Sequence, residues 1–364
     1  MTGSIYKKLR EQMDQYSIGF PETKSGIEIK ILKKLFTEEE AAMYLYLSLM
    51  LELPASVAQR TGRDAEETSN ILKIMAGKGL IFRLGKDEGV KYAVVPFVIG
   101  SYEFQLGKMD KEFAEMTEKY FEEAFLTAFG KSTVLPLRTI PVNKSVDIVM
   151  PVAPYQDAKA IIKTKDKIAV AECICRVQQG LVDKGCGKPL EVCLIFGSHA
   201  DYYLENNMAR RIDQDEAIAI LEKAEEAGLV NQPANMVNPG GMCNCCGDCC
   251  GVLRALNKFP KPADLVYNNY LAAVDSDLCS GCETCIERCQ MEAIKMNDED
   301  IAQVDIDRCI GCGLCVTTCP SDAMSLKVKP EKEKRMPPAS GQEFMMKNSE
   351  KRGTSLVPLS LAEK

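Results

Sequence analysis

The sequence predicts an α+β protein built from several domains. Three observations lead to this fold class. The first hundred residues combine helical periodicity with an alternating hairpin, the middle of the chain alternates helix and strand and is rich in cysteine, and a cysteine run is duplicated near the C-terminus. At 364 residues the chain is long enough for two or three domains, each with its own core.

The composition is that of an ordinary globular protein, with 46% apolar and 27% charged residues. The net charge of −7 excludes a general basic field that would attract nucleic acid or acidic membranes. The N-terminal stretch has no apolar core behind its positive charges, so no secretory signal is predicted. The most apolar stretch, residues 41–53, is too short to span a bilayer. We therefore expect a cytoplasmic protein without membrane insertion.

Cysteine is the most informative residue type. The chain has 17 cysteines and one histidine, and all the cysteines lie between Cys173 and Cys319. In a reducing compartment, clustered cysteines are far more often metal ligands than disulfides. With one histidine, most zinc sites that mix Cys and His are excluded. The sequence therefore predicts thiolate-rich metal sites in the middle and C-terminal parts.

Residues 28–100 have the pattern of three helices followed by a hairpin. Thr37 precedes a helical pattern over residues 38–53, Pro54 opens a short second helix, and Asp64 caps a third. Two alternating strands then flank the turn at residues 85–89. This order resembles the winged-helix domain, which implies a winged-helix-like N-terminal domain over residues 1–105.

The charge of this region is a poor match for DNA. Residues 59–91 contain seven basic and five acidic residues, a net charge of +2. The third helix, which would contact DNA, begins with Glu66 and Glu67. DNA is therefore a partner that the sequence allows but does not favour, and a packing or dimerisation module, including a homodimer, is preferred.

The remaining boundaries follow from periodicity and composition. Residues 106–150 are predicted to be a helical connector with an amphipathic helix over 110–129. Residues 151–270 are predicted to form a cysteine-rich α/β middle domain, with a helix over 213–230 that Asp213 caps. Residues 331–364 are charged and polar, with proline and glycine breakers, and are predicted to be a disordered tail.

The duplicated run consists of two C-x₂-C-x₂-C-x₃-C patterns that begin thirty residues apart, at Cys279 and Cys309. Each half is predicted to supply a short strand, a cluster loop and a turn of helix. Three closely spaced thiolates surround one face of a [4Fe–4S] cubane, and the fourth cysteine of each run ligates the other cluster. One predicted ligand set is Cys279, Cys282, Cys285 and Cys319, and the other is Cys309, Cys312, Cys315 and Cys289.

This pattern resembles the bacterial-type two-cluster ferredoxins, with all eight ligands present over about sixty residues. The resemblance implies that residues 271–330 form a βαβ-repeat domain that binds two [4Fe–4S] clusters. A proline commonly follows the fourth cysteine, as at Pro320, but Gln290 stands at the equivalent place after Cys289. A zinc ribbon or disulfides would explain two complete runs poorly.

Nine further cysteines lie in the middle domain. Adjacent residues of an extended chain point to opposite sides, so Cys245 and Cys246 are not expected to serve one cubane. Two four-ligand sites, or one site and a dithiol pair, are both open. We expect at least one further iron–sulfur cluster, with zinc at Cys246 and Cys249 as the second choice. The candidate ligands are Cys173, Cys175, Cys186, Cys193, Cys243, Cys245, Cys246, Cys249 and Cys250.

The whole chain resembles multidomain iron–sulfur proteins of anaerobes, in which a winged-helix-like segment precedes a cysteine-rich segment and a two-cluster ferredoxin. Arg176, directly after Cys175, is a candidate for hydrogen bonds to cluster sulfides or to an anionic substrate, although a structural salt bridge is preferred. A structural role is likewise preferred for His199 over that of a ligand or proton donor. Neither a dinucleotide-binding nor a phosphate-binding glycine loop is present.

These observations favour a polyferredoxin-like electron-transfer protein that exchanges low-potential electrons with a partner oxidoreductase. The alternatives are a redox-sensing winged-helix transcription regulator and a catalytic subunit that uses a middle-domain cluster. Acidic residues near the cysteine runs fit either electrostatic steering of a basic partner or an ordinary solvated surface. These residues are Asp275, Asp277, Glu283, Glu287, Asp305 and Asp307.

Overall fold

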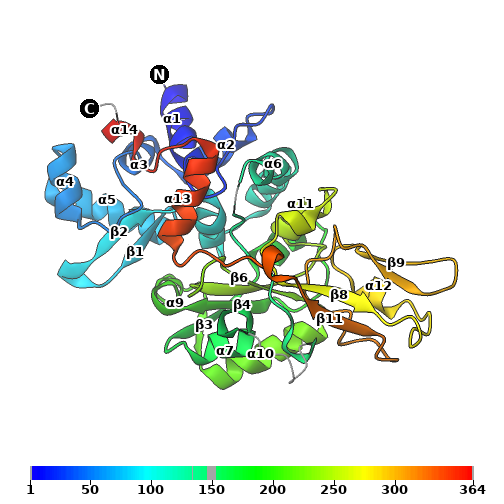
Figure 1. Ribbon diagram of the computed structural model, residues 1–364. Coiled ribbons are helices and arrows are strands. Elements are labelled where there is room, and N and C mark those ends of the chain that lie inside the picture. Colours follow the sequence, from blue (N-terminus) through cyan, green and yellow to red (C-terminus); the bar gives the residue numbers. More distant parts are fainter. Residues whose placement is uncertain (1, 133, 146–152, 363–364) are drawn as a thin grey trace. The chain divides into compact units, whose positions relative to one another are not determined.

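The computed structural model describes residues 2–132, 134–145 and 153–362, and the chain divides into two compact units (Figure 1). Unit 1 contains the chain up to Pro136, Asp201–Met208 and the segment from Gln342. Unit 2 contains Leu137–Ala200 and Ala209–Gly341. The predicted boundary at residue 150 lies outside the described residues. None of the described helices combines the length and the apolar character needed to cross a bilayer.

Unit 1 is largely helical and has an aromatic core. Asp64 caps its fifth helix by accepting hydrogen bonds from the amides of Glu66 and Glu67. In the core, the ring of Phe20 packs between those of Phe97 and Tyr120. The elements are α1 (Thr2–Asp14), α2 (Ile27–Leu35), α3 (Glu38–Tyr44), α4 (Pro54–Thr61), α5 (Ala65–Lys78), the hairpin β1 (Ile81–Leu84) and β2 (Lys91–Val94), and α6 (Lys111–Gly130).

The helix predicted over residues 38–53 is shorter in the structure, because α3 ends at Tyr44. The backbones of Glu52 and Tyr92 exchange two hydrogen bonds of 2.9 Å, and Val94 donates one of 2.9 Å to Ser48. The segment after α3 therefore extends the hairpin at its β2 edge. Backbone partners on a neighbouring strand outweigh a helical periodicity that only the local sequence supports.

The predicted disordered tail is also corrected, since residues 341–362 contain α13 (Gly341–Arg352) and α14 (Leu359–Ala362). The side chain of Asn348 is fully buried and exchanges hydrogen bonds of 3.1 and 2.9 Å with the backbone of Val134. Phe344 is buried as well. A few specific contacts order this segment, and its polar composition does not reveal them.

The centre of unit 2 is a five-stranded antiparallel sheet with strand order β5–β3–β4–β7–β6. Two helices, α7 (Ala158–Lys163) and α10 (Gln214–Glu226), cover one face (Figure 1). Ile162, Leu194, Leu221 and Met242 lie in the core between them. The strands are β3 (Ile168–Glu172), β4 (Glu191–Phe196), β5 (Arg210–Ile212), β6 (Val230–Pro233) and β7 (Gly241–Cys245).

Three further helices of the cysteine-rich segment start at or near strand ends. They are α8 (Ile174–Leu181), α9 (Gly197–Glu205) and α11 (Gly251–Asn257). Cys173 and Cys250 are the residues that precede α8 and α11. Most cysteines of this segment therefore lie on β4 and β7 or around two junctions that lead into helices, and Cys186 lies in the loop between α8 and β4.

The last part of unit 2 has two small antiparallel sheets. Its elements are β8 (Tyr270–Val274), α12 (Thr284–Arg288), β9 (Ile294–Met296), β10 (Ala302–Val304) and β11 (Met324–Val328). β8 pairs with β11, and β9 pairs with β10. The first strand of one cysteine run therefore lies beside the last strand of the other, so the two halves are interleaved.

Candidate iron–sulfur and metal sites

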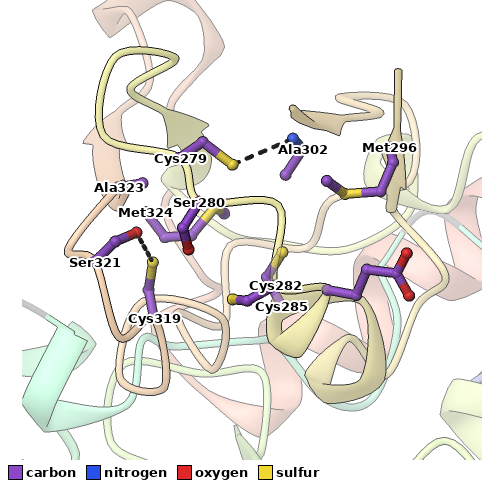
Figure 2. Close-up of a pocket in the computed structure, with 11 residues that line it drawn as sticks. Cys279, Ser280, Cys282, Cys285, Met296, Ala302, Cys319, Ser321, Ala323 and Met324 are labelled. Carbon is purple, nitrogen blue, oxygen red and sulfur yellow. Dashed lines mark hydrogen bonds between the residues drawn. The ribbon is translucent and has the colours of Figure 1, made fainter. Parts of the chain in front are cut away.

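Four cysteines of the duplicated runs line one pocket (Figure 2). Cys279, Cys282 and Cys285 come from the first run, and Cys319 comes from the second. Cys282 is exposed and Cys285 is buried. The pocket therefore combines three thiols of one run with the fourth thiol of the other, and it opens to solvent at Cys282.

The other four cysteines of the runs form a second, more buried group. The electrostatic fields of Cys289 and Cys309 act on Cys312, and those of all three act on Cys315. Cys309 and Cys315 are buried. Burial raises the pKa of Cys312 to about 12, so this thiol needs a positive partner in order to ionise.

Backbone amides donate hydrogen bonds to sulfur atoms in both groups. The amide of Ala302 lies 3.5 Å from Cys279 Sγ, and that of Ala272 lies 3.4 Å from Cys309 Sγ. Ala272 and Ala302 occupy equivalent positions of the repeat, and each donates to a cysteine of the other half. Ala293 donates to Cys289 at 3.3 Å. Such N–H donors favour the anionic form of sulfur and therefore suit metal-bound thiolates.

Glycines hold the cluster loops close to the neighbouring backbone. Gly281 and Gly311 adopt left-handed conformations with φ of 67° and 66°. A Cβ atom at Gly281 would lie 2.9 Å from the carbonyl oxygen of Asp300, and one at Gly311 would collide with the carbonyl of Tyr270. Only glycine therefore combines this conformation with this approach.

The two thiol groups, the amide donors and the glycine loops together fit four-iron clusters held by cysteine. Residues 272–326 match the 4Fe-4S dicluster domain. The matched segment contains both cysteine runs, and the dicluster domain gives the chain the capacity for iron–sulfur electron transfer. No curated protein and no solved structure matches the chain. The prediction of a ferredoxin-type domain near the C-terminus is confirmed.

Six of the other nine cysteines form a ring in which each thiol contacts two neighbours. Contact with Cys193 and Cys245 lowers the pKa of Cys243 to about 5. The cysteines come from β4, β7 and the starts of α8 and α11, which are far apart in the sequence. In order of contact, the ring is Cys173, Cys175, Cys250, Cys245, Cys243, Cys193 and again Cys173.

Strand pairing explains how the ring forms. Leu194 on β4 lies opposite Met242 on β7, and both face the core beneath α7 and α10. One step along the same register, Cys193 and Cys243 face the other side of the sheet, and Cys245 follows Cys243 on that side. The alternation of side chains along β7 thus places Cys243 and Cys245 in one site.

The last three cysteines of the segment form a separate group. The sulfur atoms of Cys186, Cys246 and Cys249 all lie within 4.8 Å of one another, and Cys186 Sγ is 3.8 Å from Cys246 Sγ. Contact with Cys249, together with the positive charge of Arg176, lowers the pKa of Cys246 to about 6 against the effect of burial. This group is referred to below as the three-thiol site, and the six thiols above as the six-thiol ring.

Arg176 lies close to thiols of both groups. It is 3% exposed, and its guanidinium donates to the carbonyl oxygens of Pro189 at 2.7 Å and Asn244 at 2.8 Å. It also contacts the sulfur of Cys246. Among the described residues, the partners of the guanidinium are carbonyl oxygens and a thiol rather than a carboxylate, which differs from the salt bridge preferred from the sequence.

His199 lies on α9 and belongs to neither group of thiols. Its imidazole packs against Gly240, where an added Cβ atom would lie 2.9 Å from Nδ1.

The division of nine cysteines into six and three did not follow from their spacing in the sequence. The alternation that separates Cys245 from Cys246 was the one signal that pointed to it.

Proposed function

We propose that the protein is an electron-transfer protein that exchanges low-potential electrons with a partner oxidoreductase. In this proposal the pocket cysteines hold one [4Fe–4S] cluster and the buried group holds the second. The pocket that combines Cys319 with three cysteines of the first run carries the proposal, because crossed ligation requires that combination. The proposed ligands are Cys279, Cys282, Cys285 and Cys319 for the outer cluster, and Cys309, Cys312, Cys315 and Cys289 for the inner one.

The exposure of the two groups supports a direction for the electron path. Cys282 is exposed, so the outer cluster is the one that a partner would approach. Cys289 of the inner group is followed in the chain by Gln290, whose side chain accepts a hydrogen bond from the amide of Gly247. Gly247 comes directly after Cys246 of the three-thiol site. Electrons would pass from the outer to the inner cluster and then to a further iron–sulfur centre in the six-thiol ring.

The clusters supply reversible one-electron chemistry, and the chain tunes it. Amide donors such as Ala302 and Ala293 stabilise negative charge on the sulfurs and therefore raise the reduction potential. Burial has the opposite effect, because the reduced cluster carries more negative charge than the oxidised one. A buried inner cluster and an exposed outer one would accordingly differ in potential.

The surface around Cys282 suits a basic partner. Asp277, Glu283 and Glu287 are exposed there, and Leu278 is exposed beside Cys279. An apolar contact with an acidic surround is typical of a docking surface that steers a positively charged protein. The partner oxidoreductase would dock here with basic residues around its own electron acceptor.

Iron content and EPR of serine variants test the ligand sets on the full chain purified without oxygen. Cys279→Ser and Cys319→Ser should each remove the same reduced-cluster signal and up to about four irons. The double variant Cys279→Ser/Cys319→Ser should lose no more iron than either single variant. Cys279→Ser/Cys289→Ser should lose about eight, since it damages both clusters. If Cys319→Ser instead removes the signal that Cys309→Ser removes, crossed ligation is wrong.

A further inference from the structure

We propose that Cys186, Cys246 and Cys249 bind a single zinc ion in a site separate from the six-thiol ring. This metal site goes beyond the proposed electron-transfer function, which involves iron–sulfur clusters alone. The inference rests on the spacing of the sulfur atoms, on the way the chain delivers them, and on the buried charge beside them.

The spacing fits one metal ion. With a Zn–S bond of about 2.3 Å, two thiolates of a tetrahedral site stand about 3.8 Å apart. Cys186 and Cys246 have this separation, at 3.8 Å, and Cys249 completes a group whose sulfurs are all within 4.8 Å. In a cubane each thiolate binds a different iron, so its sulfurs stand farther apart. Among the described residues, the dicluster cysteines form no group of three this close.

The six-thiol ring has a different pattern of contacts. Cys243 touches Cys193 and Cys245, while Cys173 and Cys250 act on it only through longer-range electrostatics. A single ion would draw all of its ligands into mutual contact, whereas a ring in which each thiol has two neighbours leaves room for several metal ions. The ring therefore suits a polynuclear centre, and the three-thiol site suits a mononuclear one.

The loop of residues 245–250 sends neighbouring cysteines to different sites. Cys245 and Cys250 belong to the ring, and Cys246 and Cys249 belong to the three-thiol site. The amide of Cys249 donates to the sulfur of Cys246, a bond that suits a metal-bound thiolate at the start of a C-x₂-C loop.

The third ligand is held against this loop by an ion pair. Lys188, two residues after Cys186, forms an ion pair with Asp248, with its Nζ 2.5 Å from Oδ2. In the sequence, Asp248 lies between Cys246 and Cys249. Zinc would fix this loop, and with it Cys245 and Cys250 of the ring. Three protein thiolates would leave the fourth coordination position to water.

The buried guanidinium of Arg176 gives independent support. Its Nε has no hydrogen-bond partner among the described residues, and the carbonyl oxygens that it contacts are neutral. A buried cation needs a nearby negative charge. The thiols that act on it electrostatically are Cys246 of the three-thiol site and Cys173 and Cys245 of the ring. Metal-bound thiolates in both sites would provide that charge.

Matched cysteine variants separate the two sites. Zinc and iron are measured in the full chain purified without oxygen. Cys246→Ser and Cys249→Ser should each lose about one zinc per chain and retain the iron of the unmodified protein. Their direct neighbours, Cys245→Ser and Cys250→Ser, should lose iron and retain zinc. Loss of iron from Cys246→Ser or Cys249→Ser without loss of zinc, or an unmodified protein without zinc, would overturn the proposal.

A second measurement uses the unmodified protein and therefore does not require that any variant folds. Zinc-edge X-ray absorption of the unmodified chain should show three sulfur neighbours at about 2.3 Å and one lighter atom at about 2.0–2.1 Å. Four sulfur neighbours would place the zinc in the ring or in the dicluster domain. A shell of lighter atoms alone would indicate zinc bound elsewhere on the surface. Either result would contradict the assignment.

Discussion

The side chain of Gln290 accepts a hydrogen bond of 2.7 Å from the backbone amide of Gly247. Gln290 follows Cys289 of the dicluster domain, and Gly247 follows Cys246 of the three-thiol site. The fit is close, because a Cβ atom at Gly247 would lie 2.8 Å from the carbonyl oxygen of Gln290. Asn257 donates to the same carbonyl at 3.1 Å. The residue that departs from the ferredoxin pattern is thus one of those that join the two cysteine-rich parts of unit 2.

Replacing Gln290 with the common residue, proline, should weaken this junction and leave the cluster ligands intact. Loss of one such hydrogen bond costs about 1 kcal/mol, which corresponds to a fall of about 2–4 °C in Tm for a unit of this size. Iron content should be unchanged, and reduction of the middle-domain centre through the dicluster domain should slow in rapid-freeze EPR. The control Gln290→Glu keeps an oxygen acceptor and should behave like the parent. Equal Tm and equal rates for Gln290→Pro would show that the junction does not depend on this bond.

Glu225 should make the stability of unit 2 fall as pH rises. Burial raises its pKa above 4.5, although its carboxylate accepts a hydrogen bond of 2.8 Å from the amide of Asn143. Because the folded pKa exceeds the unfolded one, the stabilisation is complete below about pH 4.5 and is lost as pH rises through the folded pKa. Glu225→Gln should therefore be more stable than the parent at pH 8, by about 1 kcal/mol, and should approach it at lower pH.

Urea unfolding of the full chain between pH 5.5 and 8 measures this difference. Glu222→Gln on the same helix is the control, because Glu222 is partly exposed and the ion pair with Lys159 lowers its pKa. That variant should show no gain in stability as pH rises. If the difference in free energy of unfolding between Glu225→Gln and the parent stays constant over this pH range, the raised pKa of Glu225 is contradicted.

Reversing charge at Glu283 and Glu287 should slow electron transfer to a basic acceptor protein. Both side chains are exposed near Cys282, where the partner is proposed to dock. Association with such an acceptor should fall about tenfold at low salt for Glu283→Lys/Glu287→Lys, and the difference should shrink as salt screens the charges. Stopped-flow oxidation of the reduced protein measures the rate. Asp215→Lys, an exposed charge reversal on α10, should have a much smaller effect, and an equal effect would argue against docking at Cys282.

Asn348 should be essential to the order of the C-terminal segment. Its two hydrogen bonds to Val134 are buried, and Asn348→Ala would leave both backbone groups without a partner at a cost of about 1–3 kcal/mol. Limited proteolysis should then cleave α13 well before the rest of unit 1. Met346→Ala on the same helix is the control, since Met346 is 55% exposed. Equal protease resistance of the two variants would mean that other contacts hold α13.

The sequence identified local features correctly where the signal is local. The caps at Thr37 and Asp64 and the start of α4 at Pro54 are present as predicted, because a cap depends on residues two or three positions apart. The predictions from the sequence were wrong where contacts with residues far away along the chain determine the local structure. The segment of Glu52 joins a hairpin in place of continuing α3, and α13 is ordered by contacts with a residue more than two hundred positions away.

For the function, the sequence by itself determined the dicluster domain. Its eight cysteines lie in two short runs with a spacing typical of cluster binding, so no tertiary information is needed to recognise the domain. The winged-helix interpretation and the identity of the partner stay predictions, because a series of helices and strands does not determine what a surface binds.

Only the tertiary structure decided how the nine middle cysteines are shared. Cys173, Cys193 and Cys243 come from separate strands and junctions, and the pairing of β3, β4 and β7 brings them to one face. Cys245 and Cys246 are neighbours in sequence, yet they enter different sites, because Cys245 is the last residue of β7 and Cys246 begins the loop that follows. The physical reason is general: spacing along the chain specifies ligands that one loop delivers, and sheet register specifies those that different strands deliver.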